Sequence, residues 1–274
     1  MRTRILTGLS AFIIFLPFLI FSDTIAFPIA MAICSVVSVF EMIHCVGLHK
    51  NPVLTVPLCL VAAATPVCLR LLGIDPVMAA VPGAILVFLL YVLAITTFSK
   101  GKLPVTESST VLMTSIYIIA GFAAMVYLRD FHEGGKYIYL LTFIGAWVPD
   151  TFAYFTGMLF GKHKLIPDVS PKKTVEGAVS GIFGAVAACL IYGLLIELFT
   201  EVSANYLSLA IIGLILSFIS QLGDLAASLI KREYGVKDYG SILPGHGGIM
   251  DRFDSVLAVS TPLMAICILL PPFN

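Results

Sequence analysis

Residues 76–97 read PVMAAVPGAILVFLLYVLAITT, a run of 22 residues without a charged side chain. A helix needs about 20 mostly apolar residues to cross a bilayer, so this run alone is long enough. The rest of the 274-residue chain has the same character, since 59% of its residues are hydrophobic and 12% are charged. Ordinary soluble domains carry about 25% charged residues. The chain is therefore predicted to be an integral membrane protein.

The apolar residues form long blocks rather than the strict alternation of an outer-membrane barrel, which predicts spanning helices and an all-α fold. We expect one integral-membrane domain, residues 1–274, with about nine transmembrane helices. The first block follows Arg2 and Arg4, and we interpret it as an uncleaved helix because eight further blocks follow it. The nine blocks are 5–21, 25–43, 53–72, 76–97, 108–128, 136–160, 177–196, 205–227 and 253–270.

The distribution of basic residues predicts the orientation. The formal net charge is zero, which excludes a globally basic nucleic-acid binder. With the N-terminus in the cytoplasm, the outside segments keep three basic residues, Arg70, Arg129 and Lys136. The inside segments then hold thirteen, as the positive-inside rule requires: Arg2, Arg4, Lys50, Lys100, Lys102, Lys162, Lys164, Lys172, Lys173, Lys231, Arg232, Lys237 and Arg252.

Residues 1–130 are predicted to be scaffold helices, and residues 131–274 to carry the catalytic site. Within the scaffold, Glu41 and His44 lie one helical turn apart, and ionisable residues in a span are functional candidates by default. We nevertheless expect both to be solvated at the membrane interface. The six cysteines show no C-x-x-C pair, so neither a disulfide nor a zinc site is predicted.

The first polar segment covers residues 150–177. Asp150 lies within an apolar block, where an acidic residue at mid-helix costs about 2.5 to 3.5 kcal/mol, so it should face a wet cavity or the bundle interior. Alternatively, it snorkels to the cytoplasmic end. Ser170 and Pro171 predict a helix N-cap followed by Pro at the first helical position. With Lys172 and Lys173 beside it, such a helix start would bind phosphate; alternatively, the lysines only contact anionic lipid.

The second polar segment begins in the eighth block, where Gln221, Asp224, Ser228 and Lys231 follow helical spacing on one face. The next loop is rich in glycine, which permits tight turns and close approach to a ligand. Its candidate site residues are Lys237, Asp238, His246, Gly247 and Gly248.

The last block opens with Asp251-Arg252-Phe253-Asp254, which places two aspartates one helical turn apart. Together with Asp224 they give three carboxylates that would repel one another without a cation. We predict that Asp224, Asp251 and Asp254 bind Mg²⁺, which prefers oxygen ligands and completes its shell with water and substrate phosphates. The alternative, an acidic residue that stabilises a helix N-terminus, suffices for Asp251 alone.

Residues 228–254 read SLIKREYGVKDYGSILPGHGGIMDRFD. This run resembles the signature of the phosphatidate cytidylyltransferase family, the CDP-diacylglycerol synthases, without a broken position. Residues 150–177 resemble the segment that precedes the signature, and the first half of the chain is similar more weakly. Two positions depart from the family pattern, since Ala227 stands where many members carry Glu and Phe152 where many carry Gly.

The resemblance implies a nucleotidyltransferase of phospholipid biosynthesis, in which the phosphate of phosphatidic acid attacks the α-phosphorus of CTP and pyrophosphate leaves. It also implies a divalent metal. We expect Mg²⁺ as cofactor, with K⁺ as a candidate second cation. The expected partners are CTP, phosphatidic acid and membrane lipids but no nucleic acid, and a homodimer is left open.

The site residues are assigned to two groups. The predicted catalytic residues are Asp224, Lys237, Asp238, His246, Asp251 and Asp254. His246 has two candidate roles, to assist the departure of pyrophosphate or to orient an aspartate. The residues predicted to bind substrate are Asp150, Ser170, Lys172, Lys173, Ser228, Lys231, Arg232, Gly247, Gly248 and Arg252. Which of the basic residues bind CTP and which bind the lipid phosphate is left open.

Two other functions remain open. A CTP-using lipid kinase would transfer the γ-phosphate instead, and an ion-coupled transporter would bind substrate or cation at Asp150 and Asp224. A transporter predicts polar residues near mid-bilayer in both halves, whereas here they gather in the second half and at one membrane face. Both polar loops are predicted to be cytoplasmic, and the short N-terminus favours a bacterial inner (plasma) membrane.

Overall fold

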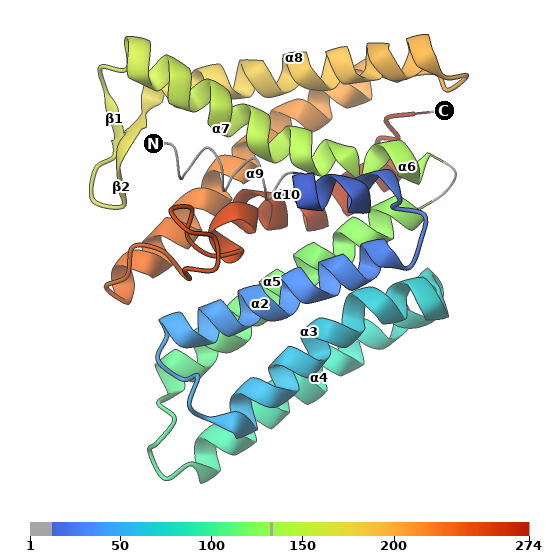
Figure 1. The fold of residues 1–274 in the computed structure, drawn as a ribbon. Coiled ribbons are helices and arrows are strands. Elements are labelled where there is room, and N and C mark those ends of the chain that lie inside the picture. The colour runs from blue at the N-terminus through green and yellow to red at the C-terminus, as the bar shows by residue number, and fades with distance from the viewer. Residues whose placement is uncertain (1–12, 132–133, 274) are drawn as a thin grey trace. The chain divides into compact units, whose positions relative to one another are not determined.

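The computed structural model describes residues 13–131 and 134–273. Within them, eight helical segments are long and apolar enough to cross a membrane. They are α2 (Ala26–Cys45), α3 (Pro52–Leu72), α4 (Ile74–Phe98), α5 (Val105–Asp130), the short α6 (Gly135–Ile138) with α7 (Leu140–Phe160), α8 (Val175–Phe199), α9 (Tyr206–Glu233) and α10 (Met250–Leu269) (Figure 1).

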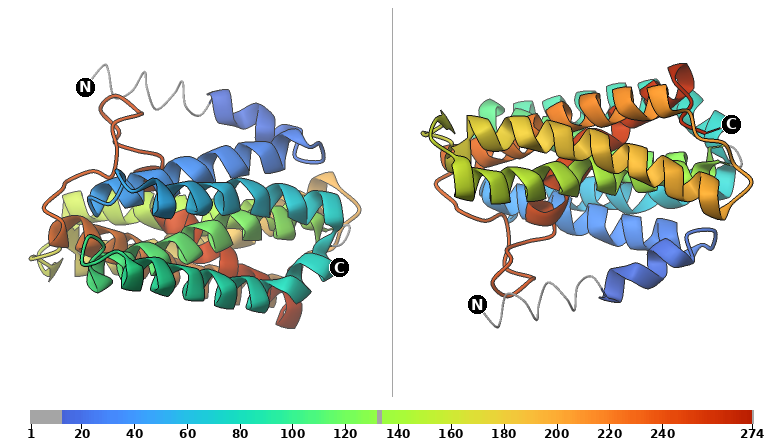
Figure 2. Two further views of the ribbon diagram at one scale, coloured as in Figure 1. Left: turned by 90° about the horizontal axis from the view of Figure 1, so that it is seen from below. Right: turned by 90° about the horizontal axis from the view of Figure 1, so that it is seen from above.

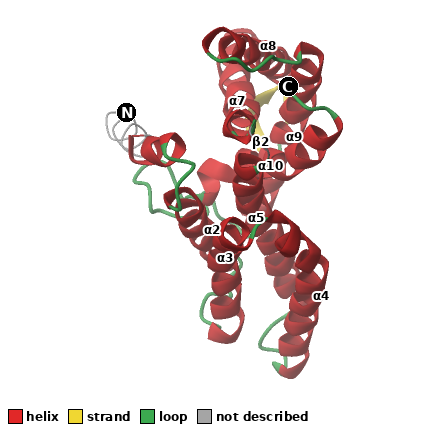
Figure 3. Ribbon diagram, turned by 90° about the vertical axis from the view of Figure 1, so that its right-hand side faces the viewer, coloured by secondary structure: helices red, strands yellow, loops and turns green. Residues whose placement is uncertain are grey.

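These helices confirm the prediction of an all-α, multi-pass membrane protein. Every predicted span after the first has its helix. Residues 13–20 of the first predicted span are also helical, and its residues 5–12 lie outside the described part of the chain. A short antiparallel hairpin of β1 (Lys164–Ile166) and β2 (Ser170–Thr174) interrupts the helices (Figure 3).

The chain divides into two compact units. The first combines Met1–Tyr127 with Tyr234–Arg252, and the second combines Leu128–Glu233 with Phe253–Asn274. Helix α10 therefore starts in the first unit and continues in the second. The predicted scaffold, residues 1–130, ends close to this division, but the glycine-rich loop before α10 groups with the scaffold helices.

In the first unit, α2 packs against α3, and α3 against α4. Phe27 and Met31 of α2 and Leu54 and Leu58 of α3 are fully buried. Helix α4 is apolar but mostly exposed, which is typical of a helix that faces lipid. The unit also buries polar side chains that the scaffold prediction did not anticipate: Ser35, Ser38, Glu41, Thr55, Ser108, Thr114 and Ser115.

In the second unit, α7, α8 and α9 pack closely through glycines. Helices α7 and α8 run side by side (Figures 1 and 2), and α8 presents a G-x-x-x-G pair, Gly177 and Gly181, to α7. A Cβ added at Gly181 would lie 2.9 Å from the carbonyl oxygen of Pro149, and one at Gly177 would lie 2.6 Å from that of Ala153. Small residues of this kind let helix backbones approach closely in membranes. The contact fixes the polar end of α7 next to the start of α8.

Candidate active site

Three carboxylates approach one another in the second unit. They belong to Asp150 on α7, Asp224 on α9 and Asp254 on α10, and Asp224 is close enough to the other two for their negative charges to repel. The Ser255 hydroxyl bridges two of them, at 3.2 Å from Asp150 Oδ2 and 3.4 Å from Asp254 Oδ1. Three separate helices therefore build one acidic cluster.

Two lysines offset part of this negative charge. Lys173, on β2, forms an ion pair with Asp224 and also attracts Asp150. Lys231, two turns beyond Asp224 on α9, attracts Asp254. The cluster thus brings together five residues from β2 and three helices, and all five were predicted as site residues. Its mixture of carboxylates and ammonium groups suits a site that handles both cations and phosphates.

The predicted helix start at Ser170 is wrong. Residues 170–174 form β2, and α8 begins at Val175, where the Thr174 side chain accepts a hydrogen bond from the backbone N–H of Gly177 at 3.2 Å. Ser170 therefore caps no helix, and Lys172 and Lys173 lie on a strand. The reason is local, because Pro167 and Asp168 favour a turn that folds β2 back onto β1 before the helix starts.

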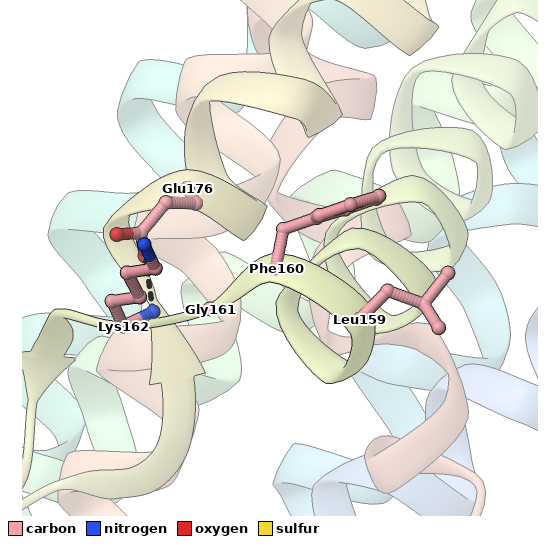
Figure 4. A pocket seen from close by; sticks show the side chains of 5 residues that line it. All are labelled: Leu159, Phe160, Gly161, Lys162 and Glu176. Atoms are coloured by element: carbon pink, nitrogen blue, oxygen red, sulfur yellow. Dashed lines mark hydrogen bonds between the residues drawn. The ribbon is translucent and has the colours of Figure 1, made fainter.

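A glutamate that the sequence predictions did not include, Glu176 in the first turn of α8, holds the segment between α7 and β1. Glu176 accepts hydrogen bonds from the backbone N–H of Lys162 at 3.1 Å and of His163 at 3.2 Å, and its Oε1 lies 2.6 Å from His163 Nδ1. An open pocket beside it is lined by Leu159, Phe160, Gly161, Lys162 and Glu176 (Figure 4). This pocket shares no residue with the acidic cluster, and the carboxylate in it is already hydrogen-bonded to the protein.

The first unit holds a different pair of carboxylates. Glu41 of α2 is 4% exposed and accepts hydrogen bonds from the backbone N–H groups of Ile249 at 3.1 Å and Met250 at 2.9 Å. Asp251 Oδ2 accepts from the N–H groups of Tyr239 at 2.8 Å and Gly248 at 3.0 Å. Both carboxylates therefore hold the backbone around the first turn of α10.

The loop before α10 contains a tight turn at its tip. The N–H of His246 donates to the carbonyl of Leu243 at 2.8 Å, with Pro244 and Gly245 between them and Gly245 at φ +77°. This combination is typical of a type II turn. The Nδ1 atom of His246 is inaccessible to solvent and has no hydrogen-bond partner among the described residues, so neither of its two candidate roles is favoured.

The predicted site residues divide between the two units. The described residues contain no group of three or more His, Cys, Asp or Glu side chains arranged to hold a metal. Asp251 of the predicted metal trio belongs to the first unit, whereas Asp150 joins Asp224 and Asp254 in the second. The first unit also contains Lys237, Asp238, His246, Gly247, Gly248 and Arg252, and the second contains Ser170, Lys172, Lys173, Ser228, Lys231 and Arg232.

Comparison with known proteins places this chain in a family. Residues 2–270 match the sequence model of the cytidylyltransferase family. The chain belongs to this family. The phosphatidate cytidylyltransferase of Staphylococcus aureus (strain COL) is 34% identical over 270 residues, which cover 98% of this chain and 99% of the relative.

Two further relatives carry the same name. The phosphatidate cytidylyltransferase of Staphylococcus epidermidis (strain ATCC 35984) is 42% identical over 178 residues, and that of Staphylococcus saprophyticus (strain ATCC 15305) is 43% identical over 177 residues. Each of these matches covers 65% of this chain and 65% of the relative. The predicted membership of a nucleotidyltransferase family is confirmed.

The structure shows what surrounds the two residues that depart from the family pattern. A Cβ at Gly184 of α8 would lie 2.5 Å from the Phe152 ring, so the large side chain on α7 is matched by a glycine that faces it. Ala227 is buried on α9, one turn beyond Asp224.

Two residues in the neighbourhood of the predicted site were missed or misjudged from sequence. Ser255 follows Asp254 directly, and nothing in its type or spacing indicated that it would bridge two aspartates. Glu41 was expected to be solvated with His44, which is correct for the exposed His44 and wrong for Glu41. An acidic residue in a predicted span was the available signal, and its rarity there deserved more weight.

Proposed function

We propose that this protein is a phosphatidate cytidylyltransferase that forms CDP-diacylglycerol and pyrophosphate from CTP and phosphatidic acid. The observation that carries the proposal is the cluster in which Asp150, Asp224 and Asp254 meet Lys173 and Lys231. Such a site can attract a divalent cation and phosphate groups at once. The names of the curated relatives supply the substrate class.

The reaction requires charge neutralisation and alignment, because both reactants are anions. An oxygen of the lipid phosphate forms a bond to the α-phosphorus of CTP, and the bond from that phosphorus to the oxygen bridging to the β-phosphate breaks. Since the nucleophile is already an anion, no strong general base is needed. Lys173 and Lys231 would bind phosphate oxygens near the cluster, and Lys172, Arg232 and Arg252 are exposed and accessible to further phosphate groups.

The donor chemistry of the second-unit cluster fits Mg²⁺. Three carboxylates against two lysines leave one excess negative charge, and the carboxylates repel one another. Mg²⁺ takes one or two carboxylates and completes its shell with water and substrate phosphates. Asp224 and Asp254 are the residues that would hold it, and when bound it would neutralise charge on the phosphates. Asp251 as a further ligand and K⁺ as a second cation stay predictions.

The proposed location is a bacterial inner (plasma) membrane, with the active site on the cytoplasmic side. The split of thirteen basic residues inside and three outside supports this orientation. It puts the hairpin before α8 and the loop before α10 on the side where CTP is available. The acyl chains of phosphatidic acid would stay in the bilayer.

The proposal is tested with protein purified in detergent, phosphatidic acid, Mg²⁺ and CTP labelled separately at the α- and γ-phosphates. Asp254→Asn is the inactive variant, and Asp23→Asn, an exposed aspartate before α2, is the matched control. We expect the α-label in a lipid product and the γ-label in pyrophosphate with wild type and Asp23→Asn. Asp254→Asn should lose at least about 100-fold, the scale for removing one preorganised electrostatic group.

The other outcomes identify the rival functions. A γ-label that enters lipid would show a CTP-dependent lipid kinase. If neither label moves with any metal or lipid tried, the enzyme proposal fails and ion-coupled transport becomes the hypothesis to test.

A further inference from the structure

The carboxylate of Glu41 occupies the N-terminal end of α10. Its two oxygens accept hydrogen bonds from the consecutive N–H groups of Ile249 and Met250, which have no partners within the helix because they lie at its N-terminal end. Glu41 lies on α2, more than 200 positions earlier in the chain. A residue of the scaffold thus caps the start of α10.

Two glycines within residues 228–254, Gly240 and Gly248, lie against the same carboxylate. A Cβ added at Gly240 would lie 2.7 Å from Glu41 Cδ and still closer to Oε1, and one added at Gly248 would contact both carboxylate oxygens. Real Cβ atoms essentially never approach another atom this closely, so a larger residue at either position would force a shift. These glycines were predicted to allow close approach of a ligand, but the group that approaches them is Glu41.

The same turn holds Asp251, the second residue of α10. Its carboxylate accepts the N–H of Gly248, while Glu41 accepts the two N–H groups that follow. The position of Asp251 therefore depends on the backbone that Glu41 fixes. A helix N-terminus attracts anions, and at the start of α10 the anionic group in that place is the Glu41 carboxylate.

We propose that Glu41 is a positioning residue of cytidylyl transfer, which acts through the backbone of the α10 start and not through contact with substrate. This inference rests on the proposed function. Neutralising Glu41 leaves the helix without its anionic cap, and the amide of a glutamine offers one acceptor oxygen where two N–H groups need acceptors. The start of α10 and Asp251 should then sample positions that do not support the reaction.

The test measures kcat and KM for CTP and phosphatidic acid in wild type, Glu41→Gln and His44→Gln. His44 lies one turn further along α2 and is exposed, so its variant is the matched control. We expect Glu41→Gln to lower kcat about 10- to 100-fold, the loss typical of residues that orient a catalytic group, with KM values close to those of wild type. Each variant should elute as a folded species in detergent, which shows that a lower kcat does not come from unfolded protein.

A second pair of variants keeps the inference falsifiable if Glu41→Gln does not fold. In membranes, Gly248→Ala should lose activity because its methyl group meets the Glu41 carboxylate, and Glu41→Asp, one methylene shorter, should restore part of that loss. Independent losses in the double variant, or a Glu41→Gln enzyme with the wild-type kcat, would overturn the positioning role. If wild type itself makes no CDP-diacylglycerol, the proposed function has failed instead.

Discussion

Asp251 and Asp254 lie one turn apart on the same helix, yet their surroundings are opposite. Asp251, in the first unit, has an oxygen that accepts two backbone N–H groups, and neighbouring Glu41 is likewise hydrogen-bonded to backbone. Asp254, in the second unit, faces the carboxylates of Asp224 and Asp150, with Lys231 as its counter-charge. Aspartates in one motif can therefore have different surroundings, since Asp251 accepts backbone N–H groups of the loop and Asp254 faces charged side chains.

Truncating each aspartate in turn should have different effects on the loop before α10. Asp251→Ala should leave the N–H groups of Tyr239 and Gly248 without an acceptor, which costs about 1 to 3 kcal/mol for each buried group. Asp254→Ala should change stability little, because the lost hydrogen bond is offset by relief of repulsion. Hydrogen exchange of the segment 234–249 measures the difference.

We expect faster exchange in this segment with Asp251→Ala and wild-type exchange with Asp254→Ala, although both variants lose activity. Equal acceleration in both would show that the two aspartates share one structural role. Wild-type exchange in Asp251→Ala would remove the loop-building role from Asp251.

A smaller effect should follow from removing the counter-charge in the second unit. Lys173→Met breaks the ion pair with Asp224, and a charge-assisted hydrogen bond is worth about 1.5 to 3 kcal/mol. We therefore expect kcat/KM for CTP to fall about 10- to 100-fold. Because Asp224 then attracts a cation more strongly, the Mg²⁺ concentration for half-maximal rate should fall as well.

Lys164→Met is the matched control, since Lys164 is an exposed lysine on the other strand of the hairpin. Its kcat/KM and Mg²⁺ requirement should remain those of wild type. An unchanged Mg²⁺ requirement in Lys173→Met would indicate that the ion pair only ties β2 to α9 and does not compete with a cation.

The sequence predicted the spanning helices and most of the cluster because both leave local signals. Long apolar blocks are required by the thickness of the bilayer, and an acidic residue within such a block needs a polar environment. Asp150 and Asp224 were recognised in this way, and Asp254 by its spacing of one turn after Asp251. Asp224 and Asp254 were expected to converge. That Asp150 would join them was not predicted, since Asp150 is separated from Ser255 by 105 positions and helix packing decides the encounter.

Two errors have physical explanations. Ser170 and Pro171 carry the preferences of a helix start, but the turn at residues 167–168 and the Thr174 cap favour a hairpin first. Glu41 was judged by its position near a helix end, where solvent is the usual partner. Its actual partners, the N–H groups of Ile249 and Met250, lie 208 and 209 positions away, beyond any local pattern.

The smallest predicted effect concerns the start of α8, which decides how Lys173 is presented to the acidic cluster. Thr174 is the N-cap, so Thr174→Val keeps the side-chain shape, removes the acceptor for Gly177, and should lower the free energy of unfolding by about 1 kcal/mol. Ser170→Ala should change it by less than about 0.5 kcal/mol, as at sites without a specific role. Chemical denaturation in detergent measures both. A larger cost for Ser170→Ala would indicate that Ser170, and not Thr174, caps the helix. The helix N-terminus would then contribute, together with the charge of Lys173, to the positive potential at the acidic cluster.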